Sequence, residues 1–148
     1  MKILVCTDGS EHSKKALREA SVIAEGCNVN EVAIMNVFEP WSDVPFPYEG
    51  TTPEQIENFQ KIKEEQKEER KKILSEASKF FEEKNLKTRT ILKEGHPAQT
   101  IVNVAHEEKF DMIVLGSRGL GGLKKLFLGS VSNAIIQEIE NCSVLVVK

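Results

Sequence analysis

Short apolar runs alternate with stretches of helical periodicity along the whole chain of 148 residues. The runs that we predict as strands are 2–6, 32–38, 87–93, 112–115 and 143–148, and the predicted helices are 10–26, 52–84, 97–105 and 130–139. Such alternation is typical of βαβ units, which build a parallel sheet. We therefore predict one doubly wound α/β domain over residues 1–148, an open five-stranded parallel sheet with helices on both faces.

The predicted strands differ in polarity, and this difference bears on their places in the sheet. The runs 2–6, 112–115 and 143–148 are continuously apolar, as strands covered by helices on both faces are. The run 87–93 is mostly polar, which favours a position at a sheet edge.

A glycine-rich stretch follows the fourth predicted strand. Gly116 ends the apolar run, Gly119 comes three residues later, and Gly129-Ser130 stands at the start of the last predicted helix. Glycine lets a ligand approach the backbone, and a helix start offers unpaired N–H groups with a partial positive charge. These features predict an anion site, and phosphate is the usual anion. We interpret the chain as a nucleotide binder.

Several groups in this stretch suit the phosphates of a nucleotide. Gly116 leaves room for a ligand beside the strand end, and Arg118, Lys124 and Lys125 add positive charge. Backbone N–H groups and serine hydroxyls can donate to phosphate oxygens, and the candidates are Gly119, Gly129, Ser130, Val131 and Ser132. A solvated loop is the alternative for the two lysines.

Asp8 follows the first predicted strand as Gly116 follows the fourth. In an open parallel sheet, ligands bind beyond the carboxyl ends of the strands where the strand order reverses. Both residues reach one crevice if their strands are neighbours. Because a carboxylate repels phosphate, Asp8 suits a ribose hydroxyl or a phosphate-bound Mg²⁺. The alternatives are an acidic residue at a helix start for Asp8 and an ordinary helix cap for Gly129-Ser130.

The best-known phosphate motifs are not present in the sequence. GxxxxGK[ST] requires a lysine after its second glycine, but GSRGLG at 116–121 is followed by Gly122. GxGxxG starts at Gly119 and meets Lys124 in place of its last glycine, and no GxSxG occurs. We therefore expect neither a P-loop enzyme nor a standard dinucleotide binder.

Composition argues against several classes of function. A net charge of −3 and a pI of about 5.7, without a basic stripe, argue against a nucleic-acid partner. No apolar stretch approaches the roughly 20 residues of a membrane span, and the N-terminal run is too short for a signal peptide. The cysteines form no CxxC pair and the histidines no metal-ligand spacing. We expect a cytoplasmic protein without a nucleic-acid partner, a membrane partner or a metal held by protein ligands alone.

The segment between the second and third predicted strands exceeds a minimal crossover. Residues 39–53 contain four prolines together with Trp41 and Tyr48, and long loops in compact domains are often functional. In the helix that follows, no apolar residue occurs between Lys63 and Lys72. We interpret the charged part at 54–72 as a solvated helix, with partner binding as the alternative.

These motifs resemble the universal stress protein family over essentially the whole chain. Its nucleotide-binding branch carries G-x2-G-x9-G-[ST], which Gly116, Gly119, Gly129 and Ser130 match in full. The opening ILVCTDGSEHSKKALREA resembles the first strand and helix of the family, and SVLVVK resembles its closing strand. The GHP at 95–97 resembles the G-x-P before its third helix.

The resemblance implies an ATP-binding protein with the sheet order 3-2-1-4-5. By this resemblance Asp8 contacts ribose, Thr7 lines the same pocket, and Val37 meets adenine through its backbone. Leu115 and Gly116 are implied to line the base and the ribose. The positions implied to hold the phosphates, and through them any Mg²⁺, are Arg118, Gly119, Gly129, Ser130, Val131 and Ser132.

The last predicted strand bears on assembly. In the implied strand order the run from Ser143 to Lys148 lies at a sheet edge, and an exposed apolar edge invites pairing with another chain. The family forms dimers through this strand. Both arguments predict a homodimer.

Three functions are compatible with the sequence. The first, which we favour, is a regulatory protein that responds to ATP occupancy, because residues 112–132 hold no His, Asp or Glu to activate water. The second is a slow ATPase or phosphotransferase that uses Asp8, Arg118 and Mg²⁺. The third is an interaction module that docks through the charged helix.

Overall fold

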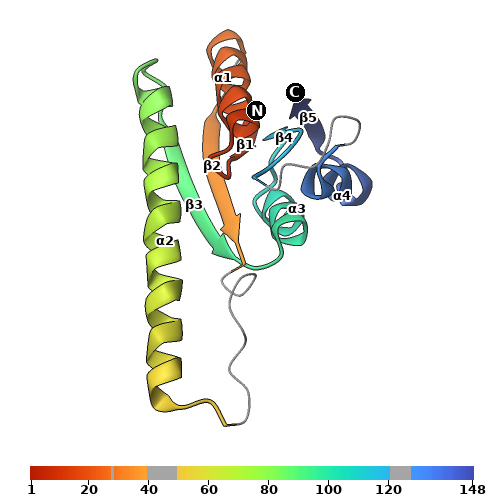
Figure 1. The fold of residues 1–148 in the computed structure, drawn as a ribbon. Helices are drawn as coiled ribbons and strands as arrows, with labels where there is room; N and C mark the ends of the chain where they lie inside the picture. Colours follow the sequence, from red (N-terminus) through yellow and green to blue (C-terminus); the bar gives the residue numbers. More distant parts are fainter. Residues whose placement is uncertain (28, 40–49, 121–127) are drawn as a thin grey trace.

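In a computed structural model of the chain, parallel strands form one open sheet with helices on both faces (Figure 1). The structure describes residues 1–27, 29–39, 50–120 and 128–148. The strands are β1 (Lys2–Cys6), β2 (Glu31–Phe38), β3 (Thr88–Glu94), β4 (Met112–Gly116) and β5 (Ser143–Val147). The helices are α1 (Glu11–Gly26), α2 (Pro53–Glu82), α3 (Pro97–Glu107) and α4 (Ser130–Glu138). The predicted alternation is confirmed, with strand boundaries that shift by a residue at β2 to β5.

The strand order is β3-β2-β1-β4-β5, which confirms the expected doubly wound sheet. β1 is central, and its Val5 pairs with Ile34 of β2 on one side and Val114 of β4 on the other. From β1 the chain builds outward through β2 and β3, and then returns to build β4 and β5 on the opposite side. The order therefore reverses between β1 and β4, and Asp8 and Gly116 follow the ends of neighbouring strands.

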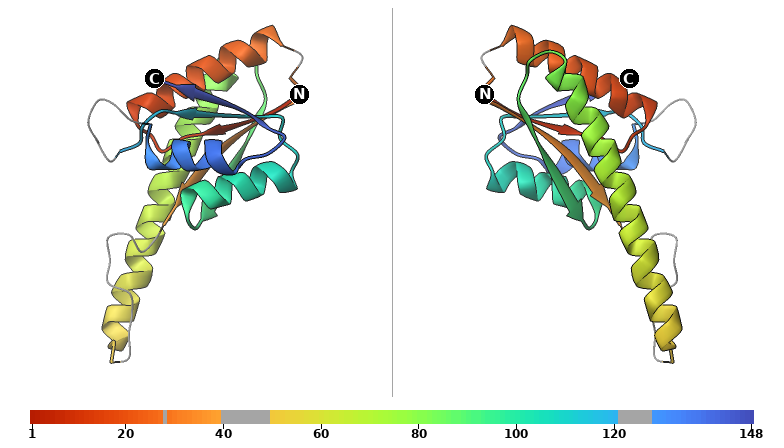
Figure 2. Two further views of the ribbon diagram at one scale, coloured as in Figure 1. Left: turned by 90° about the vertical axis from the view of Figure 1, so that its right-hand side faces the viewer. Right: turned by 90° about the vertical axis from the view of Figure 1, so that its left-hand side faces the viewer.

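The two faces of the sheet are covered by different helices (Figure 2). α1 and α2 lie on one face, and α3 and α4 lie on the other. Ile3 and Val5 of β1 pack with the first pair of helices, whereas Leu4 packs with the second pair. Because successive side chains of a strand enter opposite layers, a strand buried on both faces must be apolar throughout.

The two outer strands meet solvent differently. β3 lies at one edge, as its polarity predicts, and Ile91 is its one buried side chain. β5 lies at the other edge, where Val144 to Val147 are half-buried. Within the described part of the chain, the outer edge of β5 has no strand partner.

α2 is longer than the sheet that it covers. Thr52 caps it, and Thr52 and Gln55 form a reciprocal capping box before a helix of 30 residues. The buried side chains Leu74, Ala77 and Phe81 all lie in its C-terminal half, and the N-terminal half extends beyond the sheet (Figure 2). The predicted helix 52–84 is thus confirmed, whereas Trp41 and Tyr48 lie outside the described residues. No helix in the described ranges is long and apolar enough to cross a membrane.

Candidate functional site

A cavity of about 340 Å³ opens at the carboxyl ends of β1 and β4, on the face covered by α3 and α4. This volume is in the range of small-molecule sites. The residues predicted for the nucleotide site that the structure describes line it, namely Thr7, Asp8, Val37, Leu115, Gly116, Arg118, Gly119, Gly129, Ser130, Val131 and Ser132. The fold thus brings together residues from β2 and from the chain after β1, after β4 and at the start of α4.

Thr7 holds the turn between β1 and α1. Its N–H donates to the Met35 carbonyl at 2.9 Å, and its hydroxyl lies 3.0 Å from the Ser13 hydroxyl. The same hydroxyl oxygen accepts from the Gly9 N–H at 3.2 Å. Thr7 is buried, so its side chain builds the cavity wall while the backbone continues into α1, which Ser10 caps.

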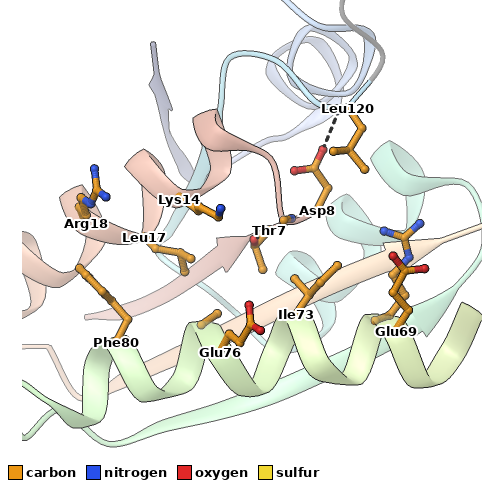
Figure 3. Close-up of a pocket in the computed structure, with 13 residues that line it drawn as sticks. Thr7, Asp8, Lys14, Leu17, Arg18, Glu69, Ile73, Glu76, Phe80 and Leu120 are labelled. Carbon is orange, nitrogen blue, oxygen red and sulfur yellow. Dashed lines mark hydrogen bonds between the residues drawn. The ribbon is translucent and has the colours of Figure 1, made fainter.

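Asp8 connects two loops through its carboxylate. One oxygen accepts from the Ser10 N–H at 2.9 Å, and the other accepts from the Leu120 N–H at 3.2 Å (Figure 3). The first bond supports the turn before α1, although Asp8 itself precedes the Ser10 cap and is not a helix residue as the alternative interpretation had it. The second bond ties the loop after β4 to the loop after β1, so the carboxylate has a structural role as well as a place in the cavity wall.

The three glycines of the motif face different neighbours. A Cβ at Gly116 would lie 2.7 Å from the His12 carbonyl carbon, so this glycine lets β4 pack against the backbone of α1. A Cβ at Gly119 would lie 2.7 Å from an Asp8 carboxylate oxygen. A Cβ at Gly129 would lie 3.2 Å from the Ser117 carbonyl oxygen. Gly116 is therefore needed for packing within the fold, in addition to the predicted room for a ligand.

The first turn of α4 presents backbone donors to the cavity. Gly129 is the N-cap, and no side chain among the described residues caps this helix. The alternative interpretation of Gly129-Ser130 as a helix cap therefore holds for Gly129, which caps α4 without a side-chain hydrogen bond. The Gly129 N–H already donates to the Ser117 carbonyl at 2.8 Å, and the Ser132 hydroxyl donates to the Gly129 carbonyl at 3.0 Å. The Gly129 N–H and the Ser132 hydroxyl are thus engaged, whereas no bond between described residues engages the other predicted donors, namely the N–H groups of Gly119, Ser130, Val131 and Ser132 and the Ser130 hydroxyl.

Part of the cavity lining is apolar. Val37 and Leu115 lie there as predicted, together with residues that the sequence analysis missed, namely Cys6, Met35, Pro97 and Ile101. Met35 precedes Val37 by two residues on the same strand, so period-two alternation was the signal for it. Burial raises the pKa of the Cys6 thiol to about 12, so this side chain is a neutral, apolar part of the wall.

The cavity lining also contains charged groups. Arg118 is half-buried beside Asp8 and Gly119 in the lining, and it is the cation that the described residues contribute there. Lys124 and Lys125 lie outside the described residues. The described residues contain no group of three or more His, Cys, Asp and Glu side chains placed to hold a metal ion.

Comparison with known proteins places this chain in a family. Residues 1–148 match the universal stress protein family. The chain is 37% identical over 147 residues to universal stress protein YxiE of Bacillus subtilis, covering 99% of this chain and 98% of that protein. The chain belongs to the universal stress protein family.

Solved structures of universal stress proteins and their relatives share its fold. The structure of protein MJ0577, which is from Methanocaldococcus jannaschii, matches with a TM-score of 0.84 at 31% identity, over 99% of this chain and 94% of that one. A universal stress protein from Archaeoglobus fulgidus in complex with dAMP matches with a TM-score of 0.67 at 25% identity, over 100% of this chain and 98% of that one. The predicted family and sheet order are both confirmed.

Proposed function

We propose that this universal stress protein binds an adenine nucleotide, ATP in the cell, and acts as a regulatory protein whose state depends on occupancy. The observation that carries the proposal is the first turn of α4. Its backbone N–H groups lie in the cavity wall without a side-chain cap from any described residue. Such a helix start favours an anion. The relative solved with dAMP supports adenine as the base.

The chemistry of the wall assigns a part of the ligand to each end. The phosphates belong at the N–H groups of Ser130, Val131 and Ser132, with Arg118 as the nearby cation. The apolar end at Val37 and Leu115 suits the planar base. A carboxylate accepts hydrogen bonds from hydroxyls but repels phosphate, so Asp8 suits the ribose between them. Any Mg²⁺ is held by the phosphates and neutralises part of their charge.

One substitution separates the backbone amide from the rest of the site. Ser130 is exposed and is the first residue of α4, where proline fits a helix because it fixes a helical φ. The preceding Gly129 already has φ −58° and ψ 155°, a conformation that proline favours in its neighbour. Ser130→Pro therefore removes the N–H and the hydroxyl while keeping the helix, and Ser130→Ala removes the hydroxyl alone.

The two variants are compared by calorimetric titration with ATP. A hydrogen bond to a charged group contributes roughly 1.5–3 kcal/mol, so Ser130→Pro should bind about ten to a hundred times more weakly than Ser130→Ala. Circular dichroism checks that both variants keep their helix content. Equal affinity of the two variants would contradict the assignment of phosphate to the α4 amides.

The identity of the bound nucleotide is tested on protein purified from cells. Acid extraction followed by chromatography should release adenine nucleotide in stoichiometric amount from the wild type. Gly129→Val, which places side-chain atoms against the Ser117 carbonyl, should release none. The nucleotide that is released distinguishes ATP from AMP and from cyclic nucleotides.

Two alternatives are separated from the regulatory proposal by the same preparations. Asp8 and Arg118 both line the cavity, which favours slow ATP hydrolysis as the second candidate. Steady ADP release over many turnovers with Mg-ATP, abolished in Asp8→Ala, would establish an enzyme. An interaction module that docks through residues 54–72 of α2 is excluded as the sole function if nucleotide is bound and lost in Gly129→Val.

We also propose a homodimer through the edge strand β5. The Val147 carbonyl accepts from the Ser117 N–H at 2.7 Å, so the backbone groups of Val147 face inward. Alternation then directs the Val146 N–H to the open edge. Val146→Pro removes that donor at an edge, where proline is tolerated, and Val146→Ala keeps it. Light scattering should find a dimer for Val146→Ala and a monomer for Val146→Pro, and equal masses would contradict this interface.

We propose the cytoplasm as the site of action, without a nucleic-acid or membrane partner. The three cysteines are free thiols in the structure, which suits a reducing compartment. The net charge of −3 offers little attraction for nucleic acid or an anionic membrane. Fractionation of cells with an antibody against the protein tests this location.

A further inference from the structure

The carboxylate that the proposed function gives to the ribose already has two partners in the structure. Oδ1 of Asp8 accepts from the Ser10 N–H at 2.9 Å, and Oδ2 accepts from the Leu120 N–H at 3.2 Å (Figure 3). Gly119 covers Oδ2 from a second direction, because a Cβ on this residue would lie only 2.7 Å from that oxygen. A ribose hydroxyl that bonds to Oδ2 must therefore displace residues 118–120, which we call the strap.

The strap begins at a residue that is firmly held. Ser117 is buried, and its N–H donates to the Val147 carbonyl at 2.7 Å. Its carbonyl accepts from the Gly129 N–H at 2.8 Å. These short bonds fix the chain at the end of β4, so a displacement at Oδ2 is confined to the residues that follow.

The strap itself is held by longer bonds. Among the described residues, two bonds tie it to the turn after β1, one from the Leu120 N–H to Asp8 at 3.2 Å and one from the Ser10 hydroxyl to the Arg118 carbonyl at 3.4 Å. Both distances lie at or beyond the long end of the usual range for their kind. The bond from the Ser10 N–H to Asp8 is shorter, so the carboxylate gives up Leu120 more readily than Ser10.

A second cavity leaves room for the strap to move. It lies between α1 and α2, on the face of the sheet opposite the proposed nucleotide site, and its volume is about 400 Å³. Asp8 and Leu120 line this cavity as well as the first, so their bond lies where the two cavities adjoin. The Leu120 side chain is 67% exposed, and its displacement therefore disturbs no packed core.

We propose that the bond between Asp8 and Leu120 is an autoinhibitory contact that a nucleotide breaks with its ribose, an inference that rests on the proposed function. Binding exchanges the Leu120 N–H for a ribose hydroxyl at Oδ2, while Ser10 keeps the carboxylate at the start of α1. The strap then loses the shorter of its two ties to the turn after β1. Occupancy of the cavity is thereby converted into release of residues 118–120, which gives a regulatory protein a surface that differs with and without nucleotide.

The first test removes the N–H and keeps the carboxylate. Leu120→Pro has no backbone N–H, whereas Leu120→Ala keeps it and loses the same exposed side chain. In calorimetric titration Leu120→Pro should bind ATP about three to ten times more tightly than Leu120→Ala, because the competing hydrogen bond is gone. Dideoxy-ATP, which lacks both ribose hydroxyls, should bind equally to the two variants. Gly119→Ala is no substitute, because its methyl group would crowd the oxygen that the ribose has to reach.

The second test needs no substitution. Hydrogen exchange of isotope-labelled wild type, followed by NMR, reports on the Leu120 amide directly. Saturating ATP should raise the exchange rate of this amide at least threefold and leave that of the Ser10 amide unchanged. Saturating dideoxy-ATP should change neither rate. If Leu120→Pro loses helix content in circular dichroism, this measurement decides alone.

The outcomes separate the strap from the nucleotide site. Equal ATP affinity of the two variants, weaker binding by Leu120→Pro, or the same ratio with dideoxy-ATP would overturn the strap proposal and leave the nucleotide site standing. An unchanged or slower exchange of the Leu120 amide with ATP would also overturn it. Absence of ATP binding by the wild type would overturn the proposed function and this inference together.

Discussion

Gly116 and Gly119 belong to one sequence motif, yet the structure predicts different consequences for replacing them with alanine. A Cβ at Gly116 would lie 2.7 Å from the His12 carbonyl carbon and 2.8 Å from the Ser13 nitrogen, both of which are backbone atoms of α1. A Cβ at Gly119 would meet the Asp8 carboxylate, the free end of a side chain that can rotate. The first contact is relieved only if β4 and α1 separate, and the second is relieved by moving one side chain.

The magnitudes follow from these contacts. Overpacking against rigid neighbours destabilises a protein by roughly 1–3 kcal/mol. Replacing glycine by alanine also stabilises it by about 0.4–1 kcal/mol, because alanine lowers the conformational entropy of the unfolded chain. Gly116→Ala should thus lower the free energy of unfolding by about 1–2 kcal/mol, which is roughly 2–8 °C in Tm for a chain of this length. Gly119→Ala can be accommodated by rotation of the Asp8 carboxylate, so its loss of stability should be smaller than that of Gly116→Ala.

The assay is urea denaturation followed by circular dichroism, with nucleotide affinity measured in parallel. Gly26→Ala is the matched control, because a Cβ there meets no atom within 4 Å and alanine favours the helix in which Gly26 lies. This control should be at least as stable as the wild type. Gly119→Ala should reduce the free energy of nucleotide binding by more than it reduces the free energy of unfolding. If Gly116→Ala unfolds within about 0.5 kcal/mol of the wild type, the packing explanation of this glycine is refuted.

Three further predictions concern the fold. Phe81 is fully buried under the sheet, so Phe81→Ala should lower the free energy of unfolding by about 3–5 kcal/mol in urea denaturation. The Arg89 guanidinium lies 2.5 Å from the Glu31 carboxylate and lowers the pKa of that carboxyl below its ordinary 4.5. The stability that this pair contributes is therefore present above that pH and is lost as the pH falls. The difference in free energy of unfolding between wild type and Glu31→Gln should shrink in acid. Thr52→Ala removes the cap of a helix half that projects from the sheet, so amide exchange should rise over the first turns of α2 while global unfolding changes little.

The fold was predictable because its signals are local. β1 is apolar at successive positions because Ile3 and Leu4 enter opposite layers, and this pattern is visible without knowing what covers either face. The polarity of β3 marked a sheet edge for the same reason. The full length of α2 was recoverable because Thr52 and Gln55 define its start even though its first half is solvated.

The meeting of Asp8 and Gly116 in one cavity was predictable, but the state of each backbone donor was not. Chain order and the rule for parallel sheets sufficed to bring Asp8 and Gly116 to one cavity. Which N–H groups stay available depends on the path of the loop after β4. The Ser117 carbonyl turns toward Gly129 and takes its N–H, and no sequence pattern reports that bond. The cavity between α1 and α2 was missed because it depends on how far two helices stand apart.

Asp8 shows why a polar residue at a strand end is hard to interpret from sequence alone. Its carboxylate supports the start of α1 through Ser10 and holds the loop after β4 through Leu120, so the fold alone gives a reason for an acid at this position. The same residue lies in the walls of both cavities, together with Thr7 and Leu120. A ligand that draws the carboxylate toward one cavity alters the wall of the other. By linkage, any such effect is reciprocal, so a bond to Leu120 that opposes the ligand is opposed by the ligand to the same extent.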